Sequence, residues 1–189
     1  MKIVISIDSL KGSLSSIEAA NAIKKGILNA DINADIVIMP LADGGEGTVD
    51  ALVEGMNGQE QLISVTGPIG EKVTAKYGIL KDTNTAIIEM AQASGLPLVP
   101  NELRNPLNTT TYGVGEIIKE AIEKGCRNFI VGIGGSATND GGVGMLQALG
   151  FEFYDENDNL LGLGGKVLNQ IRSIKIDNRL NSSIAGEWV

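Results

Sequence analysis

The chain has 189 residues, a formal net charge of −8 and no histidine. The absence of histidine excludes a Ser-His-Asp triad, a Cys-His dyad and an imidazole general base, so acid–base chemistry is left to carboxylates, Lys or Tyr. The acidic balance and the 4% aromatic content argue against nucleic-acid binding, and the single cysteine, Cys126, excludes an internal disulfide.

A reducing, cytoplasmic location fits this cysteine usage. The short apolar run at residues 3–7 is followed by Asp8 and lacks the features of a signal peptide. No stretch approaches the roughly 18 apolar residues that a membrane helix needs. We therefore expect a cytoplasmic protein that binds neither nucleic acid nor a membrane.

The first sixty residues alternate between strand and helix signals. Residues 2–7 and 35–40 are short, β-branched runs that predict buried strands. Ser15 and Glu18 form a capping box ahead of a helix that fades near residues 29–31, and a second apolar helix is predicted over residues 48–56. This β-α-β-α order predicts a parallel sheet.

The pattern changes after Gly58. Residues 61–66, 72–80 and 85–90 alternate like strands and are separated by short turns, which predicts an antiparallel meander. We place a domain boundary here, with residues 1–59 as the start of a parallel α/β domain and residues 60–189 as a second α/β domain. The fold class is therefore two-domain α/β: a partial, Rossmann-like parallel sheet plus a mixed domain with antiparallel strands.

The second half of the chain contains the best helix signal, over residues 111–124, which ends at Gly125. A short strand over residues 128–131 leads into a Gly-rich segment, and a helix over residues 141–149 follows. Residues 151–154 and 160–161 predict a hairpin, and the tail after Gly162 gives no clear signal.

The Gly-rich segment, residues 132–144, is the densest chemical signal. Glycines allow close backbone approach, successive N–H groups can form an anion nest, and the following helix presents its positive end to a phosphate. The segment offers backbone and neutral donors, and Asp140 is a candidate divalent-cation ligand; the donors are Gly134, Gly135, Ser136, Thr138 and Asn139. The alternative is a tight strand-to-helix turn with a cap.

Two phosphate motifs and one internal repeat bear on this segment. The Walker sequence is absent, whereas the dinucleotide pattern G-x-G-x-x-A matches Gly132, Gly134 and Ala137, with Asp155 as the ribose-binding acid. That weak match keeps an oxidoreductase domain open. Residues 43–47 and 140–144 both follow the pattern D-G-G-x-G, which two short matches do not establish as a duplication.

Further polar side chains follow the two predicted parallel strands, at the edge where α/β sheets bind ligands. Lys11 is a candidate for neutralising a phosphate or carboxylate, and Asp8 for accepting a hydroxyl proton. Asp43 and Glu46 are candidates for binding a metal or a sugar-like hydroxyl. The alternative for each is a solvated charge or a polar turn.

Two other charged residues invite a role. Arg104 lies in a polar loop and would grip a carboxylate or phosphate bidentately, although most single loop arginines are solvated. Glu89 lies among apolar residues at a strand end, where a paired buried acid and a catalytic acid are equally compatible with the sequence.

Long motifs in a fixed order give the chain a strong resemblance to the N-terminal half of the type I glycerate kinase family. They cover almost the whole chain and comprise DSLKGSLS at residues 8–15, PLADGGEGT at 40–48, VTGP at 65–68, IEMAQASGL at 88–96, RNP at 104–106, TTTYG at 109–113 and GIGGSATNDGG at 132–142.

This resemblance implies ATP-dependent phosphorylation of a hydroxyl of D-glycerate, in a site between two α/β domains. It implies that residues 134–138 hold the ATP phosphates, with Mg²⁺ near Asp140 or Asp43. Lys11 would stabilise the transferred group, and Asp8 or Asp43 would orient the attacking hydroxyl.

The glycerate carboxylate is expected at Arg104, with Ser9 and Thr111 as further substrate-binding candidates. The chain stops before the later motifs of the family, so a catalytically inactive fragment stays open as an alternative. An incomplete sheet edge would also favour self-association into a homodimer.

Overall fold

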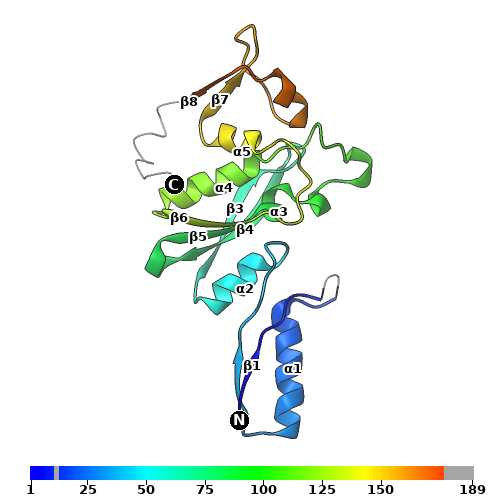
Figure 1. The fold of residues 1–189 in the computed structure, drawn as a ribbon, viewed down its shortest axis with the longest axis vertical. Coiled ribbons are helices and arrows are strands. Elements are labelled where there is room, and N and C mark those ends of the chain that lie inside the picture. Colours follow the sequence, from blue (N-terminus) through cyan, green and yellow to red (C-terminus); the bar gives the residue numbers. More distant parts are fainter. Residues whose placement is uncertain (11–12, 177–189) are drawn as a thin grey trace.

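The computed structural model describes residues 1–10 and 13–176, in an elongated arrangement of three small sheets (Figure 1). The strands are β1 (Lys2–Ile5), β2 (Asp35–Ile38), β3 (Gln59–Thr66), β4 (Lys72–Leu80), β5 (Thr85–Glu89), β6 (Asn128–Gly132), β7 (Phe151–Tyr154) and β8 (Ser173–Ile176). The α-helices are α1 (Ser16–Ala30), α2 (Thr48–Gly55), α3 (Met90–Ser94), α4 (Tyr112–Glu123) and α5 (Val143–Ala148).

The N-terminal unit is the predicted parallel pair. β1 and β2 run parallel with Lys2 opposite Asp35, and α1 connects them. The predicted capping box starts α1: the Ser15 hydroxyl accepts from the Glu18 amide, and the Glu18 carboxylate accepts from the Ser15 amide at 2.8 Å. These contacts satisfy two of the four amides that a helix start leaves unpaired.

The central sheet has the order β3-β4-β5-β6. Its first three strands form the predicted antiparallel meander, and β6 adds parallel to β5. Both faces of β5 are covered, so all five of its residues are buried. Helix α4 packs its apolar stripe on one face, against a core that includes Tyr77 and Ile88.

Helix α2 covers the other face. Val49 and Val53 of the helix pack with Leu80 and Ile87 of the sheet. Helix α2, which precedes the predicted boundary at residue 60, therefore packs on the second unit, because the apolar side chains of the helix contact the central sheet. The division into residues 1–59 and 60–189 stays a prediction.

The last described segment contains the predicted hairpin and adds a further strand to it. Tyr154 forms an antiparallel bridge with Leu160, and the Leu161 amide donates to the Phe153 carbonyl at 2.8 Å. The sequence did not predict the longer pairing of β7 with β8, which places Phe151 opposite Ile176. The residues between them include a 3₁₀-helix over Gly165–Gln170. None of the helices in the described part of the chain combines the length and the apolar character that crossing a bilayer requires.

Candidate functional site

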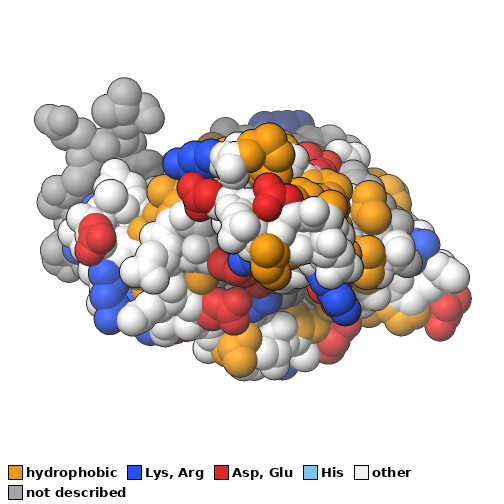
Figure 2. All heavy atoms as spheres, turned by 90° about the horizontal axis from the view of Figure 1, so that it is seen from below, with side chains coloured by type: hydrophobic (Ala, Val, Ile, Leu, Met, Phe, Trp, Pro, Cys, Tyr) orange, Lys and Arg blue, Asp and Glu red, His pale blue; other side chains and the backbone are white. Residues whose placement is uncertain are grey.

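A cleft of about 1270 Å³ lies where the N-terminal unit meets α2 and the central sheet. Its wall combines the segment after β1, the start of α1, the loop before α2, and residues from β3, β4 and the Gly-rich loop after β6. Seen from the end that carries β1 and α1, the surface exposes acidic and apolar side chains side by side (Figure 2). Segments far apart in the sequence therefore build one concave surface.

Five of the predicted site residues line this cleft: Asp8, Ser9, Asp43, Gly134 and Gly135. Glu46 lines it as well. The carboxylate of Asp8 accepts from the Ser9 amide at 2.7 Å, and that of Asp43 accepts from the Gly45 amide at 3.0 Å. Lys11 lies outside the described residues, so its predicted role rests on the sequence alone.

The two Gly-rich loops touch each other through their backbones. The Gly134 amide donates to the Gly44 carbonyl at 2.9 Å. A Cβ at Gly132 would lie 2.6 Å from the Gly44 oxygen, and one at Gly134 would lie 2.7 Å from the Gly45 Cα. Some of these glycines are therefore required for loop-to-loop packing, a purpose that the local sequence did not indicate.

The backbone of the second loop is partly committed to the protein. The Ala137 amide donates to the Ser94 carbonyl at 2.8 Å, and the Gly135 carbonyl accepts from Leu96 at 2.9 Å. The Thr138 amide donates to the Ser136 hydroxyl at 3.1 Å, and the two hydroxyls are 2.7 Å apart. These contacts fix the shape of the loop. Of its predicted nucleotide-binding residues, only Gly134 and Gly135 line the described cleft.

Asp140 and Thr111 form a buried structural contact. The Asp140 carboxylate, 1% exposed, accepts from the Thr111 amide at 2.8 Å, from the Thr111 hydroxyl at 3.0 Å, and from the amides of Gly142 and Gly144. Thr111 in turn accepts from the Met145 amide at 2.9 Å. Because N–H and O–H donors surround both carboxylate oxygens, this geometry does not fit the predicted cation, nor does it present Thr111 to a substrate.

The D-G-G-x-G repeat therefore has two different uses. In each copy the aspartate carboxylate accepts a hydrogen bond from the backbone amide two residues later in the chain. The distance is 3.0 Å for Asp43 and 3.1 Å for Asp140. Asp43 lies in the cleft wall, whereas Asp140 joins the loop to the start of α4.

Arg104 and Asn139 are exposed and do not belong to the residues that line the described cleft. The Arg104 Nε donates to the Val99 carbonyl at 3.2 Å, so the guanidinium is tied to its own loop. Asp155, the acid of the dinucleotide pattern, accepts from the amides of Asn157 and Asn159 in the turn after β7. The side-chain amide of Asn159 also donates to Asp155, at 3.0 Å, and this bond is the main reason that the pKa of Asp155 is lowered. These contacts make Asp155 a turn residue.

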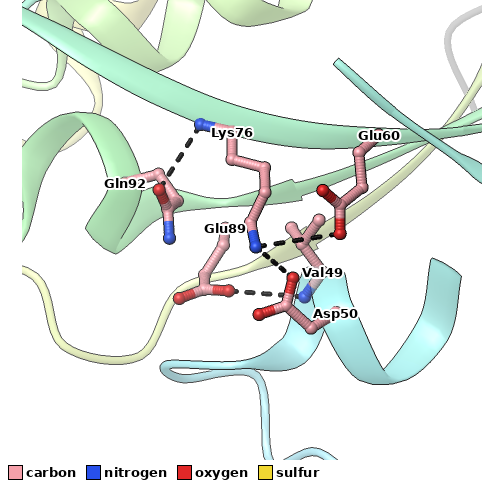
Figure 3. Close-up of polar contacts among 6 residues, drawn as sticks. All are labelled: Val49, Asp50, Glu60, Lys76, Glu89 and Gln92. Carbon is pink, nitrogen blue, oxygen red and sulfur yellow. Dashed lines mark hydrogen bonds and ion pairs between the residues drawn. The ribbon is translucent and has the colours of Figure 1, made fainter. Parts of the chain in front are cut away.

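The described part of the cleft wall is strongly acidic. Seven carboxylates and one ammonium group, that of Lys76, line it. The carboxylates belong to Asp8, Glu18, Asp43, Glu46, Asp50, Glu54 and Glu60. Lys76 contacts the Asp50 carboxylate and lies 3.9 Å from that of Glu60 (Figure 3). Burial lowers the pKa of Lys76, but the hydrogen bond and charge of Asp50 outweigh it and raise the pKa overall.

Sequence reasoning missed Lys76, Asp50, Glu60 and Gln92 as cleft residues. Alternation along β4 shows that Lys76 shares a face with Thr74, but nothing in the sequence indicates that α2 covers this face.

Among the described residues, no cluster of three metal-binding side chains exists. Mg²⁺ in phosphate-transfer sites commonly uses one or two carboxylates plus substrate phosphates, and Asp8, Asp43 and Glu46 offer such oxygens in the cleft.

Fold and site together define an α/β protein with a ligand cleft at the carboxyl ends of β1, β2 and β6, built around two backbone-packed Gly-rich loops. A solved structure has a similar fold: a protein assigned as glycerate kinase 2 from Salmonella typhimurium LT2 matches with a TM-score of 0.86 and 50% identity. The match covers 95% of this chain and 49% of that chain.

The sequence model of the Glycerate kinase family matches residues 3–186, and the chain belongs to this family. It is 54% identical to Glycerate 2-kinase of Escherichia coli K12 over 97% of this chain and 49% of that protein. It is 52% identical to a glycerate kinase of Bacillus subtilis 168 over 96% of this chain and 48% of that protein. The chain thus spans about half the length of these curated relatives.

Proposed function

We propose that this chain forms the N-terminal part of an enzyme that transfers the γ-phosphoryl group of ATP to a hydroxyl of D-glycerate. The observation that carries the proposal is the convergence of both Gly-rich loops and the end of β1 on one cleft. Membership in the glycerate kinase family supports the substrate class.

Phosphoryl transfer depends mainly on positioning and charge neutralisation. In our proposal, the phosphates contact the exposed backbone of Gly135 beside the half-buried Gly134, whose amide is already paired with the Gly44 carbonyl, and Ser9 contacts the glycerate. Asp8 or Asp43 orients the attacking hydroxyl, and Lys11 stabilises the transferred group.

The acidic cleft wall has a direct consequence for the nucleotide. A triphosphate brought beside seven carboxylates is repelled unless cations accompany it. Mg²⁺ supplies such charge when bound, and one or two carboxylates among Asp8, Asp43 and Glu46 would hold it together with the phosphates. The contacts of Asp140 and the position of Arg104 leave neither in the proposed machinery.

The test is an assay for ADP and phosphoglycerate formation from MgATP and D-glycerate. It uses the chain alone and the chain mixed with the remaining half of the Escherichia coli relative as a separate polypeptide. We expect turnover in at least one arm, lost by about two orders of magnitude or more in Asp8→Asn or Asp43→Asn, the scale of a group that orients a proton transfer.

Asp82→Asn, in the exposed turn before β5, is the matched control and should keep full activity. Turnover in neither arm, or full activity in both cleft variants, would reject the proposal. Phosphorus NMR of the product identifies which hydroxyl is phosphorylated.

A cytoplasmic location and a homodimer also belong to this proposal. Light scattering after size exclusion measures the assembly directly, and a monomer at micromolar concentration would exclude the dimer.

A further inference from the structure

Glu89 is a buried acid that the proposed chemistry does not use. It ends the fully buried strand β5, is 1% exposed, and lies opposite Gly132 in the parallel register of β5 and β6. Its side chain extends from the sheet toward the start of α2 (Figure 3). It therefore occupies the junction of the central sheet with both Gly-rich loops.

Two polar contacts join the sheet to the first turn of α2. The Glu89 Oε2 accepts from the Val49 amide at 3.3 Å, and Lys76 of β4 contacts the Asp50 carboxylate (Figure 3). In the first contact the sheet supplies the acceptor, the Glu89 carboxylate, and the helix supplies the donor. In the second contact the sheet supplies the cation, Lys76, and the helix supplies the carboxylate. A helix start offers unpaired amides and favours a nearby negative charge, so Glu89 suits this position.

The second oxygen of Glu89 has no comparable partner. Within the described residues, Oε1 is fully buried, and no donor meets the distance and angle of an ordinary hydrogen bond to it; the Gly47 amide and the Gln92 amide group are close enough only to affect the pKa of the carboxyl group. An unpaired buried carboxylate oxygen is costly, so its presence calls for a reason other than stability. We attribute the retained carboxylate to its other oxygen, Oε2, which serves as the acceptor for the start of α2. The cleft loop of residues 43–47 leads directly into this end of the helix.

We propose that Glu89 is a positioning residue of the cleft, which fixes the first turn of α2 and thereby the loop of residues 43–47. This inference rests on the proposed function only for its catalytic consequence. The Gly134 amide anchors the other side of the same loop at Gly44, so the loop is held between the sheet and the second Gly-rich loop.

The charge on Glu89 then influences how firmly the loop is held. Burial raises its pKa, the Val49 and Gly47 amides and the Gln92 amide group lower it, and the charge of Asp50 raises it. The charged groups that face it are Asp50 on α2 and Lys76 on β4, with Glu60 of β3 beyond Lys76.

The sign of the pH effect follows from the raised pKa. The folded protein retains the Glu89 proton at a pH where the unfolded chain has lost it. The contribution of Glu89 to stability is therefore full below its ordinary pKa and falls as the pH rises through the folded value. Gln at this position keeps the shape and an acceptor oxygen but does not titrate.

Hydrogen exchange of the amides in residues 43–50 tests the proposal without any substrate. In Glu89→Ala we expect exchange there to accelerate about tenfold or more, since leaving the buried Val49 amide without its acceptor typically amounts to about that factor. Glu89→Gln should restore the slow exchange. Glu71→Gln, in the exposed turn before β4, is the control.

Unchanged exchange in Glu89→Ala, or equal acceleration throughout the chain, would overturn the positioning role. Should Glu89→Ala fail to fold, the comparison of Glu89→Gln with the wild type still decides. The melting temperature of the variant relative to the wild type should increase as the pH rises from 4, below the ordinary pKa of the carboxyl group, to 8, and a constant or decreasing difference would contradict the proposal. A lack of kinase activity would reject the proposed function and leave these results unaffected.

Discussion

Replacing Gly132 with Ala probes the contact between the two Gly-rich loops. The added Cβ would lie 2.6 Å from the Gly44 carbonyl oxygen and 3.1 Å from two further backbone atoms of Gly44. All three are backbone atoms, so no side-chain rotation relieves the overlap and one loop must shift. Overpacking of this kind typically costs about 1–3 kcal/mol.

Urea unfolding followed by circular dichroism measures this cost as a change in the free energy of unfolding. Gly26→Ala is the matched control, because Gly26 lies inside α1 and a Cβ there meets nothing within 4 Å. Alanine is the better helix former, so we expect the control to gain about 0.5–1 kcal/mol. If Gly132→Ala proved as stable as the wild type, the loops would not be held by close backbone packing.

Three further predictions concern local contacts. Ser15→Ala removes the capping box of α1 and should cost about 0.5–2 kcal/mol in urea unfolding; an unchanged value would show that the cap contributes nothing. Asp140→Asn replaces one acceptor oxygen by a donor facing buried N–H groups, and should lower the free energy of unfolding by about 1–3 kcal/mol without abolishing Mg²⁺ dependence of any activity. Burial raises the pKa of the Cys126 thiol, so iodoacetamide should label it far more slowly in the folded protein than in urea at pH 8, as measured by mass spectrometry; equal rates would place the thiol at the surface.

The predicted elements were accurate where the hydrophobic periodicity and the capping or turn residues indicated the same boundaries. The capping box at Ser15 and the strand over residues 72–80 appear as expected, because a cap and an alternating strand are encoded within a few neighbouring residues. The hairpin of residues 151–154 and 160–161 is present as a short antiparallel bridge. The pairing of β7 with residues 173–176 was missed, because that segment carries no clear strand signal.

For the site, the sequence determined the residue types and the family: Gly-rich loops after strands, with acids beside them. Tertiary structure decided which of those acids face the cleft. Asp43 and Asp140 occupy the same place in the same five-residue pattern, yet only Asp43 lines the cleft, since Asp140 meets Thr111 from 29 positions away. A motif fixes local backbone geometry, whereas the partner of each side chain depends on which distant segment the folded chain brings beside it.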